Sequence, residues 1–246
     1  MKMIGGKYWG MASFFCLLVL LSLLVLGCHS NGAAAVPEVN TKPAQEKVVA
    51  AKTISAIKKA ALSLQDGDLV TRSDNDFESL TLQNFSDSDR TYSHSGIAFK
   101  EENGFVVYHS MTGTENPSGL CRKDPFDSFV SPVHKTGFGI FRYSLSKKEK
   151  EAMHGIMRGN LAKKIPFDLT FNIHTNDSLY CSEMIYKALK ASTNGRVALP
   201  TSMLYNFRPK ILGYKYNNAF LKEFEYISID NLYLNPFCKE VIRVVY

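Results

Sequence analysis

The sequence contains little Trp and Pro and no excess of Gly, and it lacks the common cofactor and metal-binding motifs. Its 246 residues include one Trp, nine Pro and 16 Gly, and 45% are hydrophobic while 21% are charged. This composition excludes collagen-like, coiled-coil and wholly disordered chains. There is no Gly-rich phosphate loop, no Cys-x-x-Cys pair and no His-Glu-x-x-His helix, so the sequence predicts no cofactor and no metal. One globular domain is the expected architecture.

The positive charge is too small and too dispersed to indicate a nucleic-acid partner. The formal net charge of +6 falls to +4 without the first 27 residues, which contain Lys2 and Lys7 but no acidic residue. Nucleic-acid-binding surfaces show a clustered basic stripe. The longest basic clusters here, 147–148 and 163–164, are pairs beside expected helix ends. We therefore expect no nucleic-acid partner.

The N-terminus has the pattern of a secretory signal. The apolar run 11–26 follows a basic start and is shorter than the roughly 20 residues that a membrane-spanning helix requires. Its end, Val-Leu-Gly-Cys at 25–28, resembles a bacterial lipobox. That resemblance implies that residues 1–27 are a lipoprotein signal peptide and that Cys28 becomes lipidated. An uncleaved anchor and an ordinary signal peptide are the alternatives.

The lipobox resemblance also implies where the protein resides. It places the chain in the bacterial cell envelope, anchored to the membrane through Cys28. His29, in place of Asp, favours the outer membrane if the organism is Gram-negative. Residues 28–47 are small and polar with two Pro, so we expect the lipid attachment and a flexible tether there. The folded domain is predicted to span 48–246.

Hydrophobic periodicity predicts an α+β domain in which helices pack on a mainly antiparallel sheet. Residues 45–64 have helical spacing, and that helix either packs on the domain or lies at a membrane surface. An Asn-Gly turn predicts a hairpin of strands 95–100 and 105–110. The remaining expected elements are strands 69–72, 137–143, 226–228 and 241–246, a helix after the capping box at 146–149, a helix starting near Cys181, and a loop or short helix over 73–89.

Two histidines flank the predicted hairpin. In either of two registers that the turn allows, the residue numbers of directly paired positions add to an odd sum. The numbers 94 and 109 also add to an odd sum, so the partner of His94 lies an even number of positions from His109. Because side chains alternate along a strand, His94 and His109 share a face of the sheet. One ring could then orient the other, as a general base requires. Ordinary half-buried histidines are the alternative. Zinc binding is disfavoured because no carboxylate is expected on the same face.

A cysteine occupies the predicted start of a helix. Unpaired N–H groups and the positive dipole end at such a position lower the pKa of a thiol, and the same groups can hold an oxyanion. Cys181 is thus a candidate nucleophile, although a small core residue is the simpler alternative. Of the other cysteines expected in the mature chain, Cys121 and Cys238 either pair in a disulfide or stay unpaired.

Local sequences around these residues resemble one enzyme family. Tyr-Ser-His-Ser-Gly-Ile-Ala at 92–98 is similar to the catalytic His segment of NlpC-like papain-fold amidases, and Val-Tyr-His-Ser at 107–110 to their next strand. Tyr-Cys-Ser-Glu-Met-Ile at 180–185 resembles the nucleophile segment of the circularly permuted, YiiX-like branch. Matches at 66–70, 165–171 and 230–236 extend the resemblance over nearly the whole domain. It implies a permuted papain-like α+β fold.

The resemblance assigns roles to particular residues. Cys181 corresponds to the nucleophile, His94 to the general base and His109 to the orienting residue. At the last position YiiX-like members often have an acidic residue, so this chain departs from the pattern. Tyr180 and Ser182 lie near the expected oxyanion hole, and we interpret Asp168 as a supporting structural residue.

These roles imply a cell-envelope cysteine hydrolase that cleaves amide bonds through a thioester acyl-enzyme, with peptidoglycan stem peptides as the substrate class. Two alternatives remain open. One is a lipid acyl hydrolase or acyltransferase, which would show an apolar channel beside Cys181 rather than polar groups. The other is a catalytically inactive binding lipoprotein of the same fold. The expected partners are a peptide or lipid amide substrate and the membrane.

Overall fold

The computed structural model describes residues 42–207 and 221–246. The predicted signal peptide, the lipidation residue Cys28 and the tether up to residue 41 lie outside the described residues. Within those residues, none of the helices combines the length and the apolar character needed to cross a bilayer. The elements in chain order are α1 (Lys42–Ser63), β1 (Asp68–Asp74), α2 (Phe77–Gln83), β2 (His94–Glu101), β3 (Gly104–His109), β4 (Arg122–Pro125), α3 (Phe126–Phe129), β5 (Lys135–Tyr143), α4 (Lys147–Ala162), α5 (Cys181–Ser192), β6 (Ser202–Phe207), β7 (Leu221–Tyr226), a 3-10 turn (Asp230–Leu232) and β8 (Cys238–Val245).

A six-stranded antiparallel sheet forms the centre of the domain, in the order β4-β3-β2-β1-β5-β8. Strands β6 and β7 make a separate two-stranded sheet. In the predicted hairpin Glu101 pairs with Gly104, which leaves a two-residue loop of Glu102 and Asn103. Gly104 has φ of +119°, a conformation open to glycine because it lacks a Cβ. The residue numbers of paired positions add to 205, which corresponds to one of the two expected registers.

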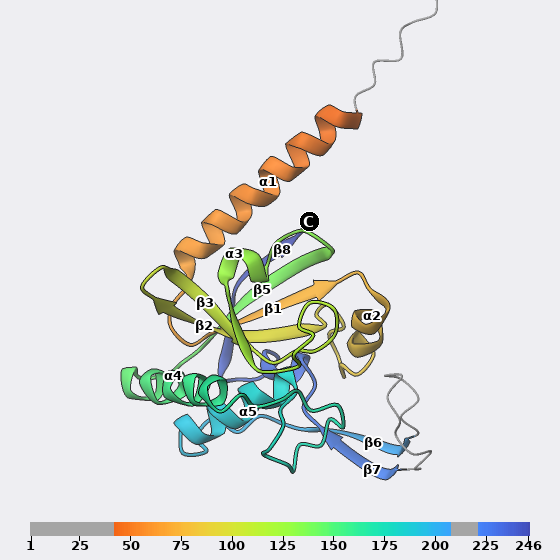
Figure 1. Cartoon of the computed structure of the whole chain (residues 1–246), viewed down its shortest axis with the longest axis vertical. Coiled ribbons are helices and arrows are strands. Elements are labelled where there is room, and N and C mark those ends of the chain that lie inside the picture. The colour runs from red at the N-terminus through yellow and green to blue at the C-terminus, as the bar shows by residue number, and fades with distance from the viewer. Residues whose placement is uncertain (1–41, 208–220) are drawn as a thin grey trace, which may run out of the picture. The chain divides into compact units, whose positions relative to one another are not determined.

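The two faces of the sheet pack against different helices, as Figure 1 shows. Because side chains alternate along a strand, Leu69 enters the cluster that contains residues of α4 and α5, while its neighbour Val70 enters the cluster that contains residues of α1 and α3. In β2, Ile97 and Ala98 divide in the same way. Both faces of the central strands are therefore buried, and a polar side chain there needs a partner from its own face.

The sequence predictions for α4 and α5 are confirmed. Helix α4 begins with the expected capping box, in which the Glu149 backbone N–H donates to the Ser146 hydroxyl and the Glu149 carboxylate accepts from the Ser146 backbone N–H. Helix α5 begins at Cys181 and buries the predicted face, including Met184 and Ile185. That apolar face holds the start of α5 against the sheet.

Several elements differ from the sequence predictions. Strand β4 was not expected, because it is a short edge strand of alternating half-buried and exposed residues without an apolar pattern. A strand was expected over 226–228, but β7 ends at Tyr226. Helix α1 starts at Lys42, inside the range expected to be a tether, with Pro43 in the first turn where a missing N–H costs nothing. Its residues Ile57 and Ala60 pack on the domain.

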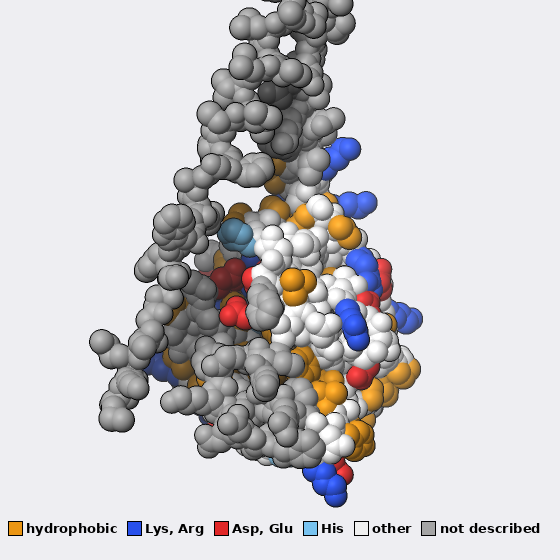
Figure 2. All heavy atoms as spheres, turned by 90° about the vertical axis from the view of Figure 1, so that its right-hand side faces the viewer, with side chains coloured by type: hydrophobic (Ala, Val, Ile, Leu, Met, Phe, Trp, Pro, Cys, Tyr) orange, Lys and Arg blue, Asp and Glu red, His pale blue; other side chains and the backbone are white. Residues whose placement is uncertain are grey.

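Charged side chains are dispersed on the visible surface. On the face drawn in Figure 2, lysine and arginine side chains lie singly among polar and apolar groups and do not form one patch. Such a distribution gives little electrostatic focusing.

Candidate active site

Three side chains form a hydrogen-bonded row at the ends of β2, β3 and β4. The Nε2 atom of His94 lies 3.0 Å from Nδ1 of His109, and Nε2 of His109 lies 3.0 Å from a carboxylate oxygen of Asp124. The predicted sharing of a face by the two histidines is confirmed. The sequence analysis missed Asp124 because it did not recognise strand β4. The available signal was the spacing of Arg122 and Asp124, which lie two positions apart in the strand and bind each other. The premise that no carboxylate lies on this face was wrong.

A glycine makes room for this row. Gly96 lies directly across the ladder from His109, since paired positions add to 205. A Cβ added to Gly96 would lie 3.2 Å from the Cβ of His109 and 2.4 Å from a methyl carbon of Val107. The missing side chain thus lets the His109 ring lean diagonally toward His94.

The row fixes the protonation of the imidazoles. Burial would raise the pKa of Asp124, but hydrogen bonds from His109 and Arg122 outweigh burial, so the net shift is downward and the carboxylate is ionised. An ionised carboxylate can only accept, so His109 donates from Nε2 and its Nδ1 accepts from Nε2–H of His94. The lone pair of His94 is then at Nδ1. The row therefore leaves His94 with one unprotonated nitrogen outside it.

The environment also keeps His94 uncharged. Burial lowers the pKa of His94 well below its ordinary value, and the positive charges of Arg72 and Lys135 lower it further. Arg72 is paired with His94 across β1 and β2, and its guanidinium lies 4.8 Å from the centre of the Phe129 ring. That ring also contacts both histidines. A neutral imidazole is the form that can accept a proton.

Cys181 lies at the first residue of α5, as predicted. From the helix dipole and the unpaired N–H groups we expected a lowered pKa of the Cys181 thiol, but in the structure that pKa is raised. Burial raises the pKa of Cys181, and the nearby Ser95 side chain and the backbone N–H groups of Ser95, Cys181 and Ser182 offset this only in part. In this state the thiol is protonated. The same N–H groups lie near the sulfur and are available to the oxyanion that develops on the carbonyl oxygen of a substrate attacked there.

The thiol and the histidine row approach β2 from different faces. Cys181 lies beside Ser95 and belongs to the core cluster of α4 and α5. The rings of His94 and His109 pack on Phe129, on the face that carries α3. Within the described ranges no hydrogen bond joins the thiol to either imidazole. The structure thus brings the two histidines together, and pairing of Cys181 with His94 stays a prediction.

The other predicted site residues hold the backbone around Cys181. The Tyr180 hydroxyl oxygen accepts from the backbone N–H of Ile227, while the Ser182 hydroxyl donates to the Ile227 carbonyl. The Asp168 carboxylate accepts from the backbone N–H groups of Thr170 and Asn172. All three predicted residues therefore bind main chain and fix the approach to α5.

The three cysteines within the described residues are unpaired. Cys121, Cys181 and Cys238 are free, so of the two alternatives for Cys121 and Cys238 the disulfide is not formed. The Cys121 thiol lies 3.9 Å from the Met184 sulfur in the core. Burial raises the pKa of Cys238 to about 12. Neither thiol is at a helix start, which distinguishes both from Cys181.

A thiol at the head of a helix that packs on an antiparallel sheet, with a histidine row at the adjacent strand ends, defines the class of papain-like cysteine hydrolases. Residues 63–233 match the family described as permuted papain-like amidase enzyme, YaeF/YiiX, C92 family, and the chain belongs to that family. The predicted fold and family are confirmed.

A solved structure supports the fold. The crystal structure of metalloprotein yiiX from Escherichia coli O157:H7 is similar with a TM-score of 0.59 and 20% identity, over 74% of this chain and 98% of that one. No curated protein matches this chain in sequence. YiiX is described as a metalloprotein. In the part of this chain that the structure describes, no group of three or more His, Cys, Asp or Glu side chains is arranged to hold a metal ion.

Proposed function

We propose that this cysteine hydrolase cleaves amide bonds with Cys181 as nucleophile and His94 as general base and acid. The row Asp124, His109 and His94 carries the proposal, because it holds His94 neutral with an available Nδ1. Cys181 lies next to Ser95, the neighbour of His94 in β2. Both reacting residues are the first residues of their elements.

The proposed reaction starts with proton transfer from the Cys181 thiol to Nδ1 of His94. The two groups are not hydrogen-bonded in this structure, so the step requires a rearrangement in the substrate complex that brings the thiol to Nδ1 of His94 while Nε2 of His94 stays bound to His109. Contacts of catalytic groups commonly tighten only in the substrate complex. His109 and Asp124 stabilise the imidazolium that forms, because the row can share its charge.

The thiolate then attacks the amide carbonyl and forms a tetrahedral oxyanion, which the N–H groups at the start of α5 stabilise. His94 gives its proton to the leaving amine as the carbon–nitrogen bond breaks and a thioester forms. Water, deprotonated by His94, hydrolyses the thioester and regenerates the thiol. No cofactor enters this proposal.

We further propose that the substrates are peptidoglycan stem peptides and that the enzyme acts in the cell envelope. The amidase family supports an amide substrate, and the predicted lipoprotein signal with Cys28 supports the location. The exposed side chains of the 171–178 segment leading to Cys181 are polar, namely Asn172, His174, Asn176 and Asp177. These observations favour a peptide over a lipid substrate.

Hydrolysis of purified muropeptides by the full chain and its variants tests the proposal. Cys181→Ser should abolish product formation, and Cys121→Ser, which changes another buried thiol, should not. His94→Ala should lower kcat by about 10²-fold to 10⁴-fold, the usual contribution of a general base. Asp124→Asn should lower kcat with little change in KM and alter the pH profile, whereas Asp127→Asn on α3 should have no effect.

Thiol labelling gives an independent measurement. The rate of iodoacetamide reaction at Cys181, followed by peptide mass spectrometry across pH with substrate analogue present, should fall in His94→Ala. An equal rate in both proteins at every pH would show that the imidazole does not act on this thiol and would refute the assignment. Full hydrolysis by Cys181→Ser would do the same.

A further inference from the structure

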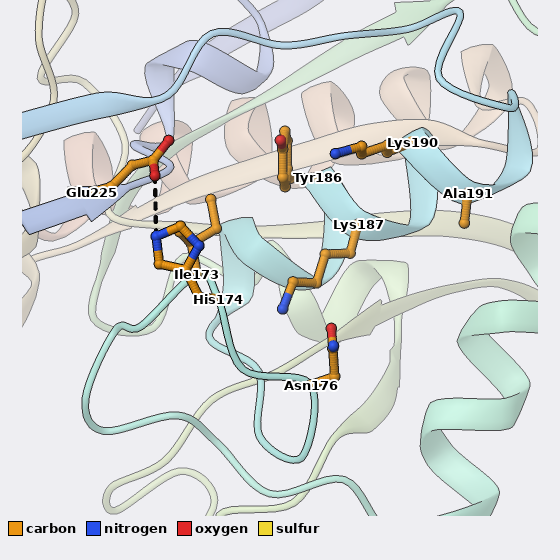
Figure 3. A pocket seen from close by; sticks show the side chains of 8 residues that line it. All are labelled: Ile173, His174, Asn176, Tyr186, Lys187, Lys190, Ala191 and Glu225. Carbon is orange, nitrogen blue, oxygen red and sulfur yellow. Dashed lines mark ion pairs between the residues drawn. The ribbon is translucent and has the colours of Figure 1, made fainter.

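A pocket of about 550 Å³ lies on the outer side of α5, away from the histidine row. Figure 3 shows its side chains arranged around an open space between α5, the segment that leads to Cys181, and β7. Its polar lining comes from His174, Asn176, Tyr186, Lys187, Lys190 and Glu225.

The pocket uses the face of α5 that the core does not. Tyr186, Lys187 and Lys190 recur at helical spacing on this face, and none of them is fully buried. Cys181 and Met184 lie on the opposite face and point into the core. The pocket is therefore a separate place on the helix that carries the candidate nucleophile.

The ammonium group of Lys187 is held by two hydrogen bonds and keeps one free N–H donor. Lys187 donates to the Thr175 carbonyl and, at 2.7 Å, to the Glu183 carboxylate. An ammonium group has three N–H donors, so one remains. The two partners fix the position of the charge before any ligand arrives, and a fixed donor binds at lower entropic cost.

The remaining donors of the pocket also outnumber its acceptors. Among the residues that the structure describes, the ammonium of Lys190 and the side-chain amide of Asn176 have no hydrogen-bond partner, and Lys190 lies 5.9 Å from the centre of the Tyr186 ring. The Glu225 carboxylate already binds the Thr201 hydroxyl and His174. The groups without a protein partner are thus mostly donors, and Lys190 carries a charge that no carboxylate of the described ranges neutralises.

We propose that this pocket binds the carboxylate of a peptide, with the ammonium groups of Lys187 and Lys190 and the Asn176 amide as donors. The floor of Ile173 and the Tyr186 ring suits a small aliphatic side chain beside that carboxylate. The identification of the ligand as a peptide rests on the proposed function. A second attachment point on the outer face of α5 would hold a branched or polymeric peptide substrate on the same helix that begins with Cys181.

Binding of a matched pair of peptides tests the proposal. The probes are N-acetyl-Ala-Ala-Ala as the free acid and as the C-terminal amide, titrated by calorimetry into the full chain with Cys181→Ser, which cannot turn them over. The acid should bind at least about tenfold more tightly, since a hydrogen bond to a charged group contributes about 1.5 to 3 kcal/mol and 1.4 kcal/mol is tenfold. Lys190→Gln should weaken the acid about threefold, as expected for an exposed charge pair.

Lys190 is chosen over Lys187 because, among the described residues, its ammonium group has no hydrogen-bond or ion-pair partner whose loss would disturb the fold. Lys148→Gln, which changes an exposed lysine on α4, is the matched control and should bind like the parent. Equal affinity for acid and amide, no binding of either, or no effect of Lys190→Gln would overturn the proposal. Inorganic phosphate binding more tightly than the acid would overturn the assignment to a carboxylate. Muropeptide hydrolysis by the unaltered protein is measured separately, so failure of binding and failure of catalysis are distinguishable.

Discussion

The substitution Gly96→Ala tests directly whether the missing side chain at this position maintains the histidine row. The new methyl group would lie 2.4 Å from a methyl carbon of Val107, 2.9 Å from the Tyr108 carbonyl oxygen and 3.2 Å from the Cβ of His109. Carbon atoms in ordinary contact are about 3.5 to 4.0 Å apart. The strands must therefore separate by roughly an ångström, or the side chains must move.

Neither adjustment is easy in the centre of the sheet. Val107 and His109 are fully buried, and β2 is hydrogen-bonded on both sides. Overpacking of this kind costs about 1 to 3 kcal/mol of folding free energy. At about 2 to 4 °C per kcal/mol for a domain of this size, Tm should fall by about 2 to 12 °C. Displacement of His109 should also change the ring signals of both histidines.

Thermal unfolding followed by circular dichroism, with histidine ring NMR spectra, measures both effects. Gly155→Ala is the matched control, because a Cβ on this exposed helical glycine of α4 meets nothing within 4 Å. It should stabilise the protein by about 0.5 to 1 kcal/mol through helix propensity. If Gly96→Ala melts at the parent temperature with unchanged histidine signals, the proposed reason for the glycine is wrong.

Two further predictions concern buried charges. The side chain of Asp68 is 1% exposed, and two guanidinium nitrogens of Arg142 bind it at 2.7 Å each. Arg142→Ala should therefore lower the free energy of unfolding by about 3 to 5 kcal/mol in denaturant unfolding, because it leaves a buried carboxylate without its partner. Adding Asp68→Asn should restore part of the loss, and no recovery would contradict the explanation by a buried unpaired charge. Burial raises the pKa of Glu183 from 4.5 to about 7, against the opposing effects of Lys187 and the Tyr180 N–H. A raised folded pKa gives stability that is complete below about 4.5 and is lost as the pH rises through about 7. Between pH 5 and pH 8 the free energy of unfolding of Glu183→Gln should therefore rise relative to that of the parent protein, by up to about 3 kcal/mol. A difference in Tm that does not depend on pH would refute the raised pKa of Glu183.

Local patterns were sufficient to predict much of this protein. Helical spacing after Cys181 placed α5, a capping box placed the start of α4, and the Asn-Gly turn placed the hairpin. Strict alternation along strands was enough to put His94 and His109 on one face of the sheet. Such features depend on neighbours a few residues apart, so the sequence alone determines them.

Tertiary structure decided what depends on distant residues. Asp124 joins the row only because an edge strand without an apolar pattern pairs with β3. The thiol pKa of Cys181 rises because long-range packing buries the residue, which outweighs the local effect of a helix start. The choice of sheet face on which α5 packs, and hence the separation of thiol and imidazole, is likewise set by the two hydrophobic clusters. Burial and pairing across the chain are sums over many contacts, and no short segment of sequence contains them.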